Sequence, residues 1–130
     1  MKVAVFVFLT TAIALVLLRF DPVIFPEVPQ PSATFDCDDS ALAMYRHFES
    51  HGIESWPIIG NLSEDDEAFS DSNHVWLLVD FGGKKIAYDW GLPRLDKQHY
   101  EGYVISLDKL LMAVDYDKTN QGGILASAGN

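Results

Sequence analysis

Apolar side chains recur with the period of a helix in two parts of the chain. From Asp39 to His51 they stand three or four positions apart, at Ala41, Leu42, Tyr45 and Phe48. This spacing is typical of an amphipathic helix, and Gly52 predicts its end. A second helical pattern has Leu107, Leu110, Leu111 and Val114 on one face, after Ser106, which can cap a helix. We therefore expect one helix early and one late in the folded region.

Between these helices the sequence is rich in β-branched and aromatic residues, which predicts strands. The run 53–59 is one strand, and Pro57 within it favours a sheet edge or a strand end. An acidic loop over 63–73 follows, and the runs 74–81 and 84–90 then flank Gly82-Gly83, a strong signal for a two-residue hairpin. Tyr103 to Ile105 is a candidate short strand. The order helix, strands, helix predicts an α+β fold with an antiparallel sheet.

The hairpin also predicts which side chains share a face of the sheet. If Gly82 and Gly83 form the loop, the numbers of paired residues sum to 165. His74, Trp76 and Asp89 then lie on one face, because strand side chains alternate. His74 and Asp89 become diagonal neighbours, roughly 7–8 Å apart at the backbone and within reach of each other's side chains. A slip of one residue would put them on opposite faces.

The N-terminal segment is apolar and predicts a membrane anchor. The run 3–18 has no charged residue and would form a helix of roughly 24 Å, against a hydrocarbon core of about 30 Å. Phe20 and the snorkelling side chains of Lys2 and Arg19 make up the difference. Lys2 and the amino terminus favour an N-terminus on the cytoplasmic side, so we expect the rest of the chain outside the cytoplasm. Cleavage as a secretory signal, which would release the domain, is the alternative.

Composition divides the remaining chain into three parts. Four prolines between positions 21 and 34 predict an extended linker. The predicted folded domain spans 35–117. Residues 118–130 are rich in Gly, Ala, Ser and Asn, and we expect a flexible tail there.

The charge of the chain excludes one class of partner. All nineteen acidic residues, but only seven of the nine basic ones (nine minus Lys2 and Arg19), lie beyond residue 19. Such a surface repels phosphate backbones, so we expect no binding to nucleic acid.

The only cysteine, Cys37, stands where the first helical pattern begins. A helix N-terminus favours a thiolate, whereas the neighbouring Asp36, Asp38 and Asp39 oppose it, so a reactive thiol here would depend on a close cation such as His74. One cysteine cannot form a disulfide within the chain. A catalytic thiol, an intermolecular bridge and an inert side chain are therefore the three interpretations.

Four short pieces follow one another in an order that resembles a known superfamily. They are Asp36 to Ala41, Gly52-Ile53, Asn73 to Trp76, and Tyr88-Asp89. The pattern is similar to that of the transglutaminase-like superfamily of papain-related cysteine enzymes, and the resemblance covers residues 35–91. It implies a transglutaminase-like core, with the nucleophile at a helix N-terminus packed on a small antiparallel sheet. It also implies a triad of Cys37 as nucleophile, His74 as base and Asp89 as the residue that orients the base.

This resemblance leads to three functional hypotheses. The first is thiol-dependent acyl transfer on amide bonds of a peptide, a protein or a cell-surface polymer, as a peptidase, amidase or transamidase. The second is a catalytically silent binding module of the same fold. The third is a membrane-anchored interaction protein with an inert cysteine. None of these requires a cofactor.

The other histidines and Trp90 receive plainer interpretations. His47 and His51 have the i, i+4 spacing of a metal pair, but Phe48 stands where the zinc-protease motif has glutamate, so we expect a polar helix face and no metal site. His99 lies in a polar run and is expected to be exposed. Trp90 is expected to pack in the core or to shield the site.

Overall fold

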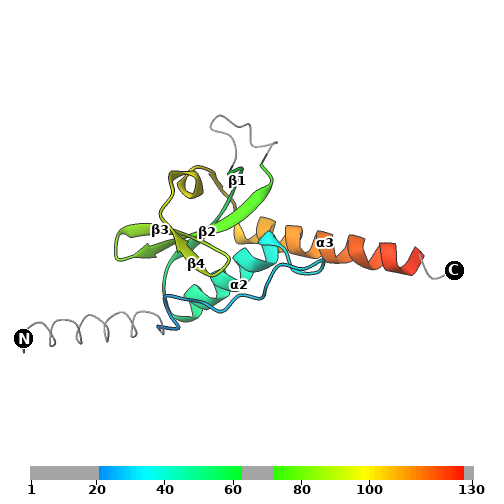
Figure 1. Cartoon of the computed structure of the whole chain (residues 1–130), viewed down its shortest axis with the longest axis horizontal. Coiled ribbons are helices and arrows are strands. Elements are labelled where there is room, and N and C mark those ends of the chain that lie inside the picture. Colours follow the sequence, from blue (N-terminus) through cyan, green and yellow to red (C-terminus); the bar gives the residue numbers. More distant parts are fainter. Residues whose placement is uncertain (1–20, 63–71, 128–130) are drawn as a thin grey trace, which may run out of the picture.

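The computed structural model describes residues 21–62 and 72–127 (Figure 1). The predicted anchor over 1–20 and most of the predicted acidic loop, residues 63–71, lie outside the described residues. Within the described ranges, no helix combines the length and the apolar character needed to cross a membrane.

The described residues form two α-helices, a short 3-10 helix and five strands. In chain order they are α2 (Cys37–Ser50), β1 (Ser55–Gly60), β2 (His74–Phe81), β3 (Lys84–Asp89), β4 (Leu92–Arg94), η2 (Lys97–Tyr100), β5 (Tyr103–Val104) and α3 (Leu107–Ser127). The strands make one sheet in the order β4-β3-β2-β1-β5, and every neighbouring pair is antiparallel. The predicted α+β class with an antiparallel sheet is thus confirmed.

Helix α2 begins at Cys37, two positions before the predicted start, because Asp36 caps it. The Asp36 side chain accepts from the backbone N–H groups of Asp38 and Asp39, and the Asp39 side chain accepts from the Asp36 N–H in return. This reciprocal pair satisfies donors that the first helical turn leaves without intrahelical partners. The helix ends before Gly52, whose φ of 68° favours glycine. Cys37 is therefore the first residue of the helix, which confirms the predicted position of the thiol at a helix N-terminus.

Helix α3 is longer than the sequence suggested. Its start is capped by Ser106, whose hydroxyl accepts from the N–H of Lys109 at 3.3 Å. It continues to Ser127, so positions 118–127 are helical where we expected a flexible tail. Lys118 explains part of the difference, because its Nζ lies 3.3 Å from Asp39 Oδ1 and ties α3 to the start of α2.

The β2–β3 hairpin has the predicted register. Phe81 pairs with Lys84 and Leu77 pairs with Tyr88, so the numbers of paired residues sum to 165. Both loop residues, Gly82 and Gly83, have positive φ, as the turns that join two strands tightly require. Side chains of β2 with even numbers therefore share a face with the side chains of β3 with odd numbers.

A second tight turn, between β3 and β4, was not predicted. The strand expected to run to Trp90 ends at Asp89, which pairs with Leu92. Trp90 and Gly91 form the turn, with φ values of 51° and 77°. Gly91 leaves no room for a side chain, since a Cβ there would lie 2.6 Å from the backbone oxygen of Pro26. This turn places Asp89 at the end of its strand.

Pro57 lies within β1 without interrupting the sheet. Its carbonyl accepts from the N–H of Ile105 at 3.0 Å, so its nitrogen also faces the β5 side. On that side β1 pairs only through Ile58 and Ile59, and the full ladder lies on the β2 side. The missing N–H therefore costs no bond to β2. The prediction of a sheet edge or a strand end was wrong, because β1 lies between β2 and β5 and Pro57 lies within it.

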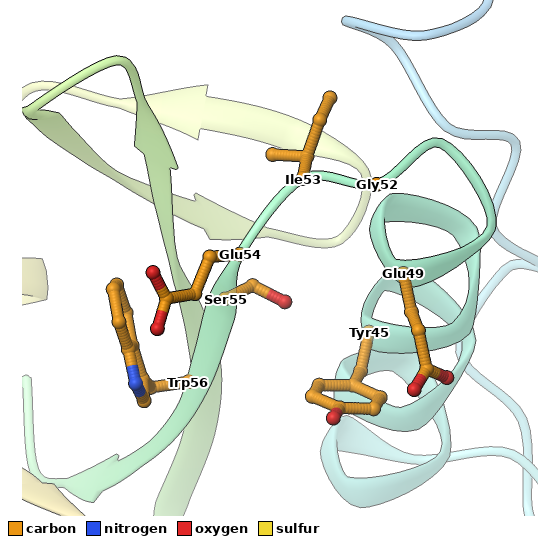
Figure 2. A pocket seen from close by; sticks show the side chains of 7 residues that line it. All are labelled: Tyr45, Glu49, Gly52, Ile53, Glu54, Ser55 and Trp56. Atoms are coloured by element: carbon orange, nitrogen blue, oxygen red, sulfur yellow. The ribbon is translucent and has the colours of Figure 1, made fainter.

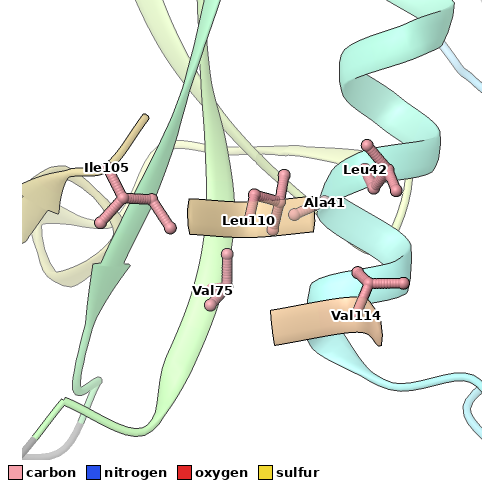
Figure 3. Close-up of a cluster of buried hydrophobic side chains, with 6 residues drawn as sticks. All are labelled: Ala41, Leu42, Val75, Ile105, Leu110 and Val114. Atoms are coloured by element: carbon pink, nitrogen blue, oxygen red, sulfur yellow. The ribbon is translucent and has the colours of Figure 1, made fainter. Parts of the chain in front are cut away.

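One cluster of buried apolar side chains joins the start of α2 to the start of β2. Figure 3 shows its six residues, which come from α2, β2, α3 and the segment before α3: Ala41, Leu42, Val75, Ile105, Leu110 and Val114. Ala41 is one helical turn from Cys37, and Val75 is next to His74. Cys37 itself packs against this cluster. The cluster therefore sets the position of the thiol relative to the first residue of β2.

Candidate functional site

Cys37 is half-buried at the N-terminus of α2, where backbone N–H groups and the helix dipole favour negative charge. Its Sγ donates to Asp38 Oδ1 at 3.6 Å. Burial and then the charge of Asp36 raise the pKa of the Asp38 carboxyl. The thiol therefore stands between the helix end, which stabilises a thiolate, and carboxylates that destabilise it.

His74 and Asp89 meet directly. His74 is the first residue of β2 and Asp89 the last of β3, and His74 Nε2 lies 2.9 Å from Asp89 Oδ2. The hairpin register produces this contact, because it puts both side chains on the same face at the same end of the sheet.

The charge of His74 links it to both other triad candidates. Burial lowers the pKa of the ring, but the hydrogen bond to Asp89, a hydrogen bond with Cys37 and the negative charges of both partners outweigh burial and raise it to about 9. Because Nε2 is taken by Asp89, Nδ1 is the nitrogen left for the thiol. Cys37, His74 and Asp89 are thus brought together in the order in which the sequence predicted them.

His99 was predicted to be exposed, and this prediction was wrong. It is only 8% exposed, and its Nε2 lies 2.9 Å from the same Asp89 oxygen that His74 contacts. Its Nδ1 contacts Asp96 Oδ1. Asp96 also caps the short helix η2 by accepting from the His99 N–H at 3.2 Å. The missed signal was an aspartate three positions before a histidine, a spacing that lets one carboxylate hold both the backbone and the ring.

Trp76 forms a common surface under the two histidines. Its ring is fully buried, stacks on the His74 ring at 5.9 Å between centroids, and meets the His99 ring edge-on at 5.8 Å. Gly60 and Gly102 make room for it: a Cβ at Gly60 would lie 2.6 Å from Trp76 Cη2, and one at Gly102 would lie 3.0 Å from it. This packing limits the orientations open to both imidazole rings.

Two aromatic side chains lie beside the site. The Trp90 ring is half-buried, 6.1 Å from the ring of Phe35. Phe35 precedes the cap of α2, and Trp90 follows Asp89. The contact therefore joins the segment before Cys37 to the end of β3.

Among the residues that the structure describes, two groups of side chains also have the donor types of a metal site. His74, Asp89 and His99 offer donor atoms within 4.8 Å of one another, and so do Asp36, Cys37 and Asp38. In the first group both nitrogen–oxygen distances are 2.9 Å, the usual length of an N–H···O hydrogen bond, so we assign a proton to each contact.

A separate pocket lies at the other end of α2 (Figure 2). It has a volume of about 410 Å³ and is lined by residues from the last two turns of α2 to the start of β1, among them Tyr45, Glu49 and Trp56. A helix of this length spans about 20 Å, and Cys37 is its first residue. The pocket is therefore not part of the triad site.

The chain matches no model of a protein family, no curated protein and no solved structure. The interpretation of the site therefore depends on its geometry and on the motifs of the sequence.

Proposed function

We propose that the protein is a thiol acyltransferase of transglutaminase-like fold, which acts on amide bonds through Cys37, His74 and Asp89. The observation that carries the proposal is the contact of His74 Nε2 with Asp89 Oδ2 at 2.9 Å, in a ring whose pKa is raised by both Asp89 and Cys37. A nucleophile, a base and a residue that orients the base are the parts that covalent catalysis on a carbonyl needs.

The chemistry follows from the charges. With a pKa of about 9, His74 is an imidazolium near neutral pH and favours a thiolate beside it. The Cys37 thiolate attacks an amide carbonyl, and the imidazolium gives its Nδ1 proton to the leaving amine, which forms a thioester and a neutral imidazole. The imidazole then takes a proton from water or from an acceptor amine, which attacks the thioester. The product is an acid or a new amide, and the proton returns the site to its first state.

The helix N-terminus also supplies a donor for the oxyanion. The Asp36 side chain accepts from the N–H groups of Asp38 and Asp39. The N–H of Cys37 has no intrahelical acceptor because it is in the first turn. It is therefore the backbone donor closest in sequence to the thiol that could hold the carbonyl oxygen.

We further propose that residues 1–20 anchor the domain on the extracytoplasmic side of a membrane, where it meets peptide, protein or polymer substrates. The apolar run 3–18 and the position of Lys2 support this. If the full chain is anchored, it stays in the membrane pellet after carbonate extraction, and a chain that lacks 1–20 does not. A mature protein that begins after residue 20 would contradict the anchor.

Alkylation of the full-length protein tests the triad. We expect Cys37 to react with iodoacetamide at pH 7 at least ten times faster than free cysteine, since only an activated thiolate reacts fast. Cys37→Ala should abolish labelling and also acyl-enzyme formation with an activated ester. His74→Ala should reduce acylation by several orders of magnitude, and Asp89→Asn by less.

The matched control is His51→Ala, which removes an exposed histidine from the far end of α2. It should leave both rates unchanged. If wild-type Cys37 labels no faster than free cysteine and His74→Ala has no effect, the enzyme proposal is wrong. The silent binding module of the same fold would then be the better hypothesis.

A further inference from the structure

His99 occupies a buried position that the three-residue chemistry does not use. Its Nε2 lies 2.9 Å from Asp89 Oδ2, and His74 Nε2 lies 2.9 Å from the same atom. The other His99 nitrogen contacts Asp96 Oδ1. One carboxylate oxygen of the triad is therefore shared by two histidines, and the second histidine is held by a carboxylate of its own.

Both ring nitrogens of His99 contact carboxylates. Hydrogen bonds with His99 lower the pKa of Asp96, and for Asp89 the hydrogen bonds and charges of His74 and His99 outweigh burial and lower its pKa as well. Both carboxylates are thus ionised near neutral pH and can only accept hydrogen bonds. A ring with such a carboxylate at each nitrogen satisfies both contacts only by donating from both nitrogens.

We propose that His99 is a positioning residue of the site, which holds the Asp89 carboxylate in the orientation that aligns His74. The inference rests on the proposed function. A His99 ring that donates to both Asp89 and Asp96 carries a positive charge, which offsets part of the attraction of Asp89 for the His74 proton. That proton must leave for the amine, so the offset makes His74 a better acid.

The surroundings of His99 show how the fold presents it. The groups that face it are Asp89 from β3, Asp96 from the cap of η2, and the Trp76 ring from β2. Trp76 contacts both imidazole rings, so a shift of one ring is restricted by the packing of the other. His74, through the shared carboxylate, is the remaining charged neighbour.

The test compares His99→Gln and His99→Ala in the full-length protein, with His51→Gln as the matched control. In His99→Gln the amide still donates to Asp89 but carries no charge. We expect its titration midpoint for the His74 ring, measured by ¹⁵N NMR, to be higher than in wild type, and Cys37 alkylation to stay within about threefold. In His99→Ala, which has no donor, alkylation should fall at least tenfold. His51→Gln should change neither quantity.

An unmoved His74 midpoint in His99→Gln would overturn the inference, whatever the stability of the Ala variant. A change in the His74 spectrum of wild type on treatment with EDTA would overturn it too, because a metal ion would then join the histidines. The proposed function fails separately: an unreactive Cys37 beside a shifted His74 midpoint refutes the enzyme but keeps the coupling of His99 to His74 through Asp89. A reactive Cys37 together with an unmoved His74 midpoint keeps the enzyme proposal and refutes the coupling of His99 to His74.

Discussion

At the scale of single residues, the charge of His74 is the property that its surroundings alter most clearly. Its pKa of about 9 exceeds the ordinary 6.5, so its stabilising contribution is complete below pH 6.5 and disappears as the pH rises through 9. The pKa of Asp89 is lowered from 3.8, so its contribution is present above that value and disappears as the pH falls. The pair is therefore at full strength between about pH 4 and 6.5.

Asp89→Asn should show this window directly. Removing the anion takes the shared carboxylate from the half-buried His74 ring and the buried His99 ring, which should reduce the free energy of unfolding by about 2–4 kcal/mol near pH 6. The difference from wild type should shrink toward pH 10, when His74 is neutral. Urea unfolding at pH 6, 8 and 10 measures it. Asp115→Asn, at an exposed position of α3, is the control, and a deficit that does not change with pH would contradict a charged pair.

The sequence predicted the meeting of His74 and Asp89 because a two-residue loop fixes their register. It missed His99 because the burial of that side chain depends on contacts that are distant along the chain. His99 lies between exposed polar residues, and its partner Asp89 is ten positions away across a turn that the pattern did not reveal. The polarity of the neighbouring residues therefore predicted an exposed His99, whereas the hydrogen bond to Asp89 keeps its side chain buried.

At the scale of elements, the cap of α2 links stability to the thiol. Asp36→Ala should reduce the free energy of unfolding by about 1 kcal/mol, and Asp36→Asn, which keeps a capping oxygen, by much less. Asp36→Ala should also change the Cys37 alkylation rate at least twofold, because Cys37 is the next residue. Ser106→Ala, which removes the cap of α3, should cost similar stability without changing that rate. Equal alkylation rates in both cap variants would contradict the link.

The packing of β1 against Trp76 gives a second prediction for the elements. Gly60→Ala should destabilise the protein by about 1–3 kcal/mol, since its Cβ would lie 2.6 Å from Trp76 Cη2. Trp76→Phe removes that atom. In the double variant the loss should be smaller than the sum of the two single losses. Chemical denaturation of the four proteins measures this coupling, and strictly additive losses would show that the clash is elsewhere.

The elements also show where sequence patterns stop being informative. Gly82-Gly83 predicted the turn between β2 and β3, because glycine adopts positive φ without strain. The turn at Trp90 could not be predicted in this way, because a bulky residue with a φ of 51° is uncommon. A tryptophan directly after a strand pattern is instead interpreted as part of the strand. In the structure the Trp90 ring rests beside Phe35, a contact that no local pattern reveals.

At the scale of the whole molecule, negative charge is concentrated around the thiol as well as spread over the surface. The chain has a formal net charge of −10. Near Cys37, the half-buried Asp117 has a raised pKa, through desolvation and then through the charge of Asp36. Lys118 is a cation at this end of α2, where it pairs with Asp39. An electrophile that approaches Cys37 therefore meets the negative field of these carboxylates as well as the charge of His74.

Two reagents that differ in charge can measure this field. Iodoacetate, an anion, should alkylate Cys37 more slowly relative to neutral iodoacetamide than it alkylates free cysteine. The ratio should approach that of free cysteine between about 0.02 and 0.5 M salt, because salt screens exposed charges. Asp117→Asn should also bring the ratio closer to that of free cysteine at low salt, because it removes one of the carboxylates. If neither salt nor Asp117→Asn changes the ratio of the iodoacetate rate to the iodoacetamide rate, the carboxylates do not act on the thiol.

The two-residue loop between β2 and β3 also has a consequence in time. A hairpin closed by two residues forms from contacts that are local along the chain, on a scale of about 1–10 μs. The docking of α2 on β2 joins more distant residues and requires the buried cluster around Ala41 and Val75. During synthesis, Cys37 leaves the ribosome first. Its base, His74, follows later, and the carboxylate that orients the base arrives only with residue 89. The newly made chain thus carries an ordinary thiol, which gains its partner only when the domain is complete.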